Sequence, residues 1–213
     1  MIKLYYIVQN SFKNLTRTSD ILVSFIMTSL SSLLSFCFLS INQFFSHWQN
    51  YTTKEAFEKG GIGLFDIISP AGMLVTFLKF SSLLIAILFI FSTISAIRRL
   101  FSQLANDQWS SLKTMSLLGE KNEIIAFEFS LQSIYTSIFS MIIGFFAADF
   151  IIKKILIYSF DFGPMKKVVG SFQISHTSYI FIVLLSCLYV GGRTFFFVKR
   201  QLISFFDNLK AML

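Results

Sequence analysis

Charged and metal-binding side chains are scarce in this sequence. Only 14% of its 213 residues are Asp, Glu, Lys or Arg, and it has two histidines and two cysteines. His47 and His176 have no nearby carboxylate or thiol ligands in the sequence, so a zinc site is not expected. No Ser-His-Asp or Cys-His constellation is evident either. We therefore expect no catalytic, cofactor-binding or metal-binding residue in this chain.

A nucleotide-binding loop is also missing. Gly119-Glu120-Lys121 is followed by Asn122 and lacks the upstream glycine of a Walker A pattern, so the chain is not expected to hydrolyse ATP itself. Cys37 and Cys187 both lie inside apolar runs. They are interpreted as buried thiols and not as a disulfide framework.

Apolar residues are abundant. They make up 54% of the chain, 28 residues are Phe, and the mean hydropathy is +0.69. Uncharged runs of about 18 or more residues are typical of transmembrane helices. The net charge of +7 fits Lys and Arg that flank membrane spans and contact anionic lipid headgroups, so no nucleic-acid partner is expected. The fold class is predicted to be an all-α integral membrane protein with four transmembrane helices.

The predicted organisation is one domain over residues 1–213. Apolar residues at helical spacing from Met1 to Leu15 predict an amphipathic interfacial helix, and Thr18-Ser19-Asp20 supplies a cap before the first span. The predicted segments are the interfacial helix 1–17, spans 21–45, 73–97, 124–152 and 178–198, outer loops 46–72 and 153–177, a coupling segment 98–123 and a tail 199–213.

Basic residues set the predicted orientation. With both termini inside, most Lys and Arg residues, including every arginine, fall on the inner segments. The positive-inside bias therefore favours cytoplasmic N- and C-termini.

Two polar features lie inside the spans. Ser24, Thr28, Ser31 and Ser35 share one face of the first span and are predicted to form a helix-packing or dimer interface, with a polar substrate path as the alternative. Lys79 lies about two turns inside the outer end of the second span. It is predicted either to extend to the headgroups or to face a cavity as a candidate substrate contact.

The segment from Trp109 to Gly144 carries the most informative pattern. Trp109, Leu112, Met115 and Leu118 recur among polar residues, which predicts a helix with one apolar side, and Gly119 breaks it before the next apolar run.

This pattern resembles the signature of FtsX/MacB-type ABC transporter permeases, the FtsX-like or type VII class. Leu112, Met115, Leu118 and Gly119 occupy its first group, and Ile125, Gln132 and Gly144 follow, with Gln132 where the family usually has Glu. Asn14-Leu15-Thr16-Arg17 is similar to the motif near the start of such permeases. Two departures are notable: Trp109 and Ser111 replace the usual Arg and Glu, and the large extracytoplasmic domain is reduced to a short loop.

The resemblance implies a membrane subunit in the bacterial cytoplasmic membrane, paired with a second, identical or homologous permease protomer. Two copies of a separate ATPase subunit would bind ATP and Mg. The implied cargo is hydrophobic or amphipathic, such as a peptide or lipid. The residues implied to couple the permease to the ATPase are Trp109, Leu112, Lys113, Met115, Leu118 and Gly119.

A second class of function stays open at this point. A non-transporting four-helix membrane protein, such as a bacteriocin immunity factor or a regulator of a cell-wall enzyme, needs no ATPase partner. Such a protein is expected to keep its activity when Leu112, Met115 and Gly119 are altered.

Overall fold

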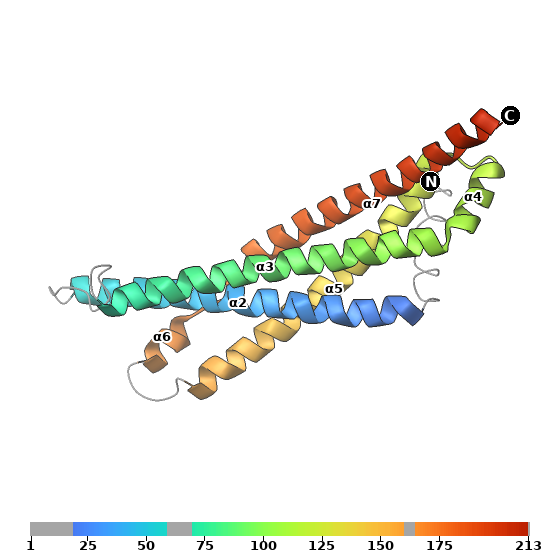
Figure 1. Cartoon of the computed structure of the whole chain (residues 1–213). Helices are drawn as coiled ribbons and strands as arrows, with labels where there is room; N and C mark the ends of the chain where they lie inside the picture. Colours follow the sequence, from blue (N-terminus) through green and yellow to red (C-terminus); the bar gives the residue numbers. More distant parts are fainter. Residues whose placement is uncertain (1–18, 59–69, 160–164, 213) are drawn as a thin grey trace. The chain divides into compact units, whose positions relative to one another are not determined.

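The structure, a computed structural model, describes residues 19–58, 70–159 and 165–212, which are almost entirely helical. No strand occurs in these ranges. The predicted interfacial helix 1–17 lies outside them. The helices, shown in Figure 1, are α2 (Ser19–Glu58), α3 (Pro70–Asp107), α4 (Trp109–Leu117), α5 (Asn122–Ser159), α6 (Met165–Ser171) and α7 (His176–Met212).

Three segments of the described helices are long and apolar enough to cross a membrane. They are Phe25–Lys54 in α2, Gly72–Asp107 in α3 and His176–Asp207 in α7. The all-α membrane class predicted from the sequence is therefore confirmed at this level. The span predicted at 124–152 lies within the continuous helix α5, which is not one of these three segments, so the predicted count of four spans stays a prediction.

The helices continue beyond the predicted spans. α2 continues to Glu58, into the predicted outer loop 46–72. α3 continues past Arg98-Arg99 to Asp107. A short helix, α6, also occupies part of the predicted loop 153–177. Charges end an apolar run, but they do not end a helix when neither Gly nor Pro interrupts it. The 40 residues of α2 are about 60 Å long, whereas the hydrocarbon core of a bilayer is about 30 Å thick.

The long helices contribute to two compact units. The described part of unit 1 comprises residues 19–29, 93–141 and 181–212, and that of unit 2 comprises residues 30–58, 70–92, 142–159 and 165–180.

Unit 1 has a core of apolar side chains from α3, α4, α5 and α7. Phe101 on α3 meets Phe129 on α5 edge to face, with ring centroids 6.2 Å apart. The buried members of this core are Ile97, Leu100, Phe101, Leu104, Ala105, Leu112, Ile125, Ala126, Phe129, Val190, Val198 and Leu202.

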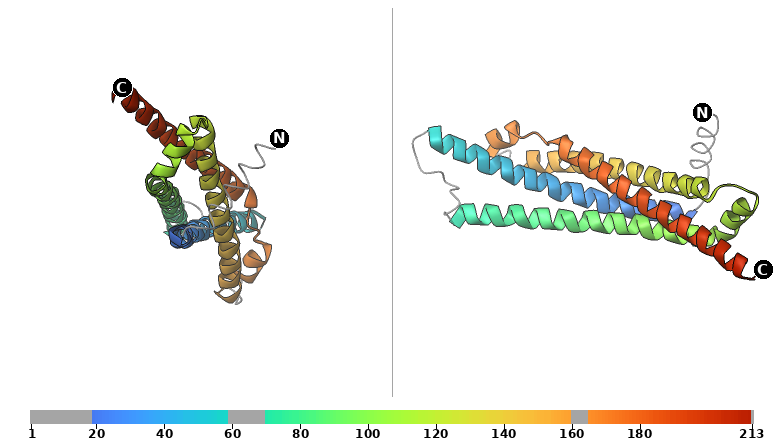
Figure 2. Two further views of the ribbon diagram at one scale, coloured as in Figure 1. Left: turned by 90° about the vertical axis from the view of Figure 1, so that its right-hand side faces the viewer. Right: turned by 90° about the horizontal axis from the view of Figure 1, so that it is seen from above.

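Unit 2 has a smaller core in which α6 packs beside α2, as Figure 2 shows. Phe44 on α2 and Val168 on α6 are buried there together with Ile152 and Leu156 on α5. The hydroxyls of Ser40 and Tyr179 lie 2.9 Å apart in a buried hydrogen bond between α2 and α7.

Glycine allows one close helix crossing in each unit. In unit 2, a Cβ added to Gly144 on α5 would come within 2.7 Å of the backbone nitrogen of Leu33 on α2. In unit 1, a Cβ added to Gly191 on α7 would come within 2.7 Å of Ile134 on α5. The neighbouring glycine makes no such contact, because nothing lies within 4 Å of a Cβ at Gly192.

Candidate functional site at the α4 elbow

α4 and the turn that follows it form an elbow, defined here as residues 108–123. Only Gln108 separates α4 from α3, and its backbone bonds continue the helical pattern on both sides. The Gln108 N–H donates to the Leu104 carbonyl at 2.9 Å, and the Leu112 N–H donates to the Gln108 carbonyl at 3.0 Å. α4 is therefore a direct continuation of α3 after a local irregularity, not a helix on a free linker.

A glycine-dependent cap ends α4. Gly119 has φ +93°, a backbone conformation that L side chains rarely adopt. The Gly119 N–H donates to the Ser116 carbonyl at 3.2 Å, and the Glu120 N–H donates to the Met115 carbonyl at 3.2 Å. These two bonds are those of a Schellman motif with Gly119 at C′. The predicted break at Gly119 is confirmed, and α5 begins three residues later at Asn122.

The inner face of α4 packs on unit 1. Leu112 is 4% exposed and belongs to the core, while Trp109 and Met115 pack against that core and are partly buried. The Ser116 hydroxyl donates to Asn122 Oδ1 at 2.6 Å and so connects α4 to the start of α5. These contacts hold α4 against the rest of unit 1, whereas a solvated loop would have no such packing.

An aromatic and cationic cluster joins α4 to α7. The rings of Trp109 and Phe205 meet edge to face at 6.2 Å, and Lys113 Nζ lies 5.3 Å from the Trp109 centroid and 4.6 Å from the Phe205 centroid. Both distances are within the range of a cation–π interaction. Of the residues expected to couple to an ATPase, Trp109 and Lys113 therefore contact α7 of the same chain.

The outer end of α4 exposes two large apolar side chains. Leu117 is 61% exposed and Leu118 is 83% exposed. They are followed by the exposed residues Gly119, Glu120 and Lys121. Leu118 is thus available at the surface as expected, whereas Leu112 is a core residue and does not fit the expected docking role. Leu117, which the sequence reasoning did not single out, lies beside Leu118.

An ion pair closes the elbow on the α5 side. Lys199 Nζ on α7 lies 3.2 Å from Glu123 Oε1. The hydrogen bond from Lys199 holds the pKa of the Glu123 carboxyl below its ordinary value, helped by the Glu123 backbone N–H. Because the pair is exposed, it contributes little to stability and mainly orients the two side chains.

The hydroxyl face of α2 is turned toward the interior of the chain. Thr28 is 0% exposed and Ser35 is 2% exposed, while Ser31 is partly buried. The side chain of Ser24 lies outside the described residues. Thr28 and Ser35 donate to backbone carbonyls of their own helix, at Phe25 and Ser31, each at 3.0 Å. Their burial assigns Thr28 and Ser35 to helix packing within the chain rather than to a free surface.

Lys79 lies on α3 in unit 2, whereas the elbow belongs to unit 1. Its carbonyl accepts a hydrogen bond from Asn42 Nδ2 on α2 at 2.6 Å and another from the Ser82 hydroxyl at 2.9 Å. The side chain is partly buried, and no described carboxylate forms an ion pair with it. Among the described residues, no hydrogen bond or ion pair joins Lys79 to another predicted site residue.

Sequence reasoning missed three partners at the elbow. They are Phe205, Asn122 and Leu117, none of which the sequence pattern assigns to the elbow. The apolar spacing at the end of α7 is the signal that could have indicated Phe205. Nothing in the sequence indicates that Asn122 accepts a bond from Ser116.

Comparison with protein-family models, with curated proteins and with solved structures finds no match for this chain. In the described residues, no group of three or more His, Cys, Asp and Glu side chains is arranged to hold a metal ion.

Proposed function

We propose that this chain is the membrane subunit of an ABC transporter, similar to the short form of an FtsX/MacB-type permease. The proposal rests on the elbow. An apolar pair, Leu117 and Leu118, is exposed at the end of a short helix that is otherwise held against the protein. A separate ATPase subunit with an apolar groove is the partner that this arrangement suits.

The elbow has the mechanical properties that coupling requires. α4 continues α3 with a single intervening residue, contacts α7 through Trp109 and Phe205, and meets α5 through Ser116 and Asn122. A force applied at Leu118 would therefore reach three long helices through packed contacts. A rigid element with two arrangements can transmit such a movement, whereas a floppy loop cannot.

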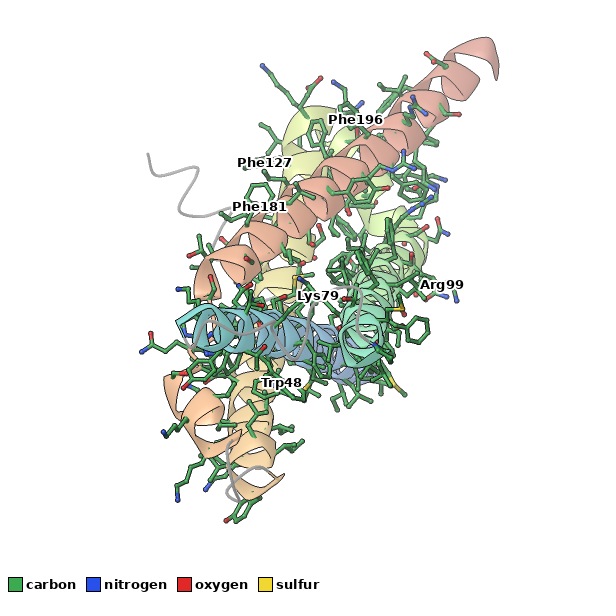
Figure 3. The ribbon with its side chains drawn as sticks, turned by 90° about the vertical axis from the view of Figure 1, so that its left-hand side faces the viewer. Trp48, Lys79, Arg99, Phe127, Phe181 and Phe196 are labelled. Atoms are coloured by element: carbon green, nitrogen blue, oxygen red, sulfur yellow. The ribbon has the colours of Figure 1, made fainter. Side chains whose placement is uncertain are left out.

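The topology in this proposal has four spans, with α5 as the third. α5 carries exposed phenylalanines at Phe139, Phe146 and Phe150, which suit contact with lipid. Figure 3 labels further exposed phenylalanines, Phe127 on α5 and Phe181 and Phe196 on α7. The proposal puts both termini on the cytoplasmic side of a bacterial membrane, because Arg98, Arg193 and Arg200 line one cavity and the positive-inside bias favours that side for them.

The proposed assembly contains two permease protomers, identical or homologous, and two ATPase subunits that bind ATP and Mg. The substrate is a hydrophobic or amphipathic molecule, such as a peptide or lipid. Closure of the ATPase pair would push on Leu117 and Leu118, and unit 1 would carry the push into α3, α5 and α7.

The test compares charged substitutions at two exposed positions of α4. Tagged full-length chain is purified from its native membrane in mild detergent, and co-purifying proteins are identified by mass spectrometry together with their ATPase activity. We expect a stoichiometric ATP-binding subunit with the wild-type chain, loss of that subunit with Leu118→Asp, and its retention with Ser110→Asp. Both side chains are exposed, so neither change disturbs the core.

Two results would contradict the proposal. One is a wild-type chain that purifies without any ATP-binding subunit, which would favour an immunity factor or a regulator. The other is an ATP-binding subunit that is retained equally by Leu118→Asp and Ser110→Asp, which would place the docking surface elsewhere.

A further inference from the structure

α3 and α7 line a cavity in unit 1 that is distinct from the elbow and combines apolar and cationic side chains. Its volume is about 700 Å³. The lining residues are Arg98 and Ser102 on α3 and Arg193, Thr194, Phe196, Phe197, Arg200, Gln201 and Ser204 on α7.

Three arginines converge on this cavity. Arg193 and Arg200 are seven residues apart on α7, which places them two turns apart on one face, and Arg98 comes from α3. No acidic residue lines the cavity, and in the described part of the chain none of the three forms an ion pair with a carboxylate. All three arginines are exposed, so their donors are free for a ligand from solvent or from the headgroup region, and their shared positive charge attracts an anion.

The remaining walls indicate which anion fits. Ser102 and Ser204 add hydroxyl groups, and Phe196 and Phe197 add an apolar surface. Gln201 donates from Nε2 to Asn106 Oδ1 at 3.1 Å, so its amide group is already engaged within the chain. A ligand that combines a negative group with an apolar portion matches these walls.

We propose that this cavity binds a phosphate group, either the phosphodiester of an anionic membrane lipid or a soluble phosphate. Guanidinium groups pair with phosphate oxygens in a bidentate geometry that suits a planar donor fork. The inference is independent of any ATPase partner, because it concerns binding to this chain alone.

A single arginine at the end of a membrane span does not by itself indicate a binding site, because its side chain can extend to the lipid headgroups. Arg99 illustrates this case. It neighbours Arg98 on α3, is exposed and extends outward in Figure 3, and does not line the cavity. It therefore offers a matched control with the same charge at the same depth.

The experiment uses the full-length chain without an ATPase, in nanodiscs and in mild detergent. Native mass spectrometry counts phosphatidylglycerol molecules retained against a phosphatidylcholine background, and titration gives the apparent affinity. In a second arm, inorganic phosphate is added to protein in phosphatidylcholine nanodiscs, and the unfolding temperature is followed. The variants are Arg193→Gln, Arg200→Gln, Arg193→Lys and the control Arg99→Gln.

We expect one retained phosphatidylglycerol per chain, a loss of about tenfold in affinity with Arg193→Gln and Arg200→Gln, and a change below about twofold with Arg99→Gln. Arg193→Lys keeps the charge but loses the fork, and its affinity is expected to lie between these values. A rise in unfolding temperature with inorganic phosphate that Arg193→Gln abolishes would instead assign the site to a soluble phosphate.

The inference is overturned if neither phosphatidylglycerol nor inorganic phosphate binds. It is also overturned if Arg99→Gln weakens lipid binding as much as Arg193→Gln, because the effect would then be general attraction to headgroups. Should Arg193→Gln fail to fold, Arg200→Gln and Arg193→Lys decide between these outcomes, since they alter one side chain each at the same cavity.

Discussion

The hydroxyl of Ser116 and the side-chain oxygen of Asn122 lie 2.6 Å apart across the turn between α4 and α5. Only one short run of chain separates the two residues, and Gly119 lies within it in a positive-φ conformation. The hydrogen bond and the glycine therefore determine the same feature, the angle at which α4 meets α5.

Replacing Gly119 by alanine is expected to weaken the elbow. Nothing lies within 4 Å of the added Cβ, so the cost comes from the backbone conformation alone and is about 1 kcal/mol of unfolding free energy. Gly192→Ala is the control, because Gly192 lies within α7 with equally open space around it. That change is expected to be neutral or stabilising by up to about 1 kcal/mol. Equal effects of the two changes in reversible unfolding would argue against strain at Gly119.

Replacing Gly144 by alanine is expected to destabilise unit 2 for a different reason. The new methyl group would press on the backbone nitrogen of Leu33, and a backbone atom cannot move aside as a flexible side chain can. Overpacking of this kind typically costs about 1–3 kcal/mol. The loss should appear in unfolding measurements and be larger than that of Gly191→Ala, where the neighbour is the side chain of Ile134. A cost at Gly144 no greater than at Gly191 would contradict this close approach.

Lys113 is expected to stabilise the packing of α4 on α7. The substitution Lys113→Met keeps an unbranched apolar stem but removes the charge above the rings of Trp109 and Phe205, at a cost of about 0.5–1 kcal/mol. Lys121→Met is the matched control, since Lys121 is exposed on the turn and has no ring contact among the described residues. If the two methionine variants unfold alike, the cation–π contribution of Lys113 is negligible.

The pair between Glu123 and Lys199 is expected to make stability depend on pH under acidic conditions. The folded-state pKa of Glu123 is lowered by the Lys199 hydrogen bond, so the unfolded chain takes up the proton first as the pH falls. The stability that the ion pair contributes is fully present at neutral pH, begins to decline below about pH 4.3 and disappears below the folded-state pKa of Glu123. The difference in stability between the wild-type chain and Glu123→Gln, measured against pH, should shrink over that range. A difference that stays constant would exclude this linkage.

Much of the architecture could be predicted from local patterns. Apolar runs located three helices that can span a membrane, Gly119 located a real break, and the spacing around Leu112 and Met115 indicated an apolar side of α4. Each of these depends on residues close together in the chain, where backbone preference and burial agree.

The rest depends on contacts between distant segments. Which end of α4 stays exposed was not predictable, because Leu112 and Leu118 look equivalent in the sequence but only Leu112 reaches the unit 1 core. The helix ends were misplaced where charged residues continue a helix past its apolar run, as at Arg98. The cavity between α3 and α7 joins residues almost a hundred positions apart, and no spacing rule relates Arg98 to Arg193.

The elbow also provides a way to read which side of the membrane it occupies. Lys121 lies on an exposed turn outside any helix, while Lys113 is held within α4 between two aromatic rings. Trypsin requires an extended, accessible stretch of backbone and should therefore cut after Lys121 well before Lys113. In sealed vesicles of known sidedness, the appearance of that single cut would assign the elbow to the cytosol or to the exterior without a tag or a partner.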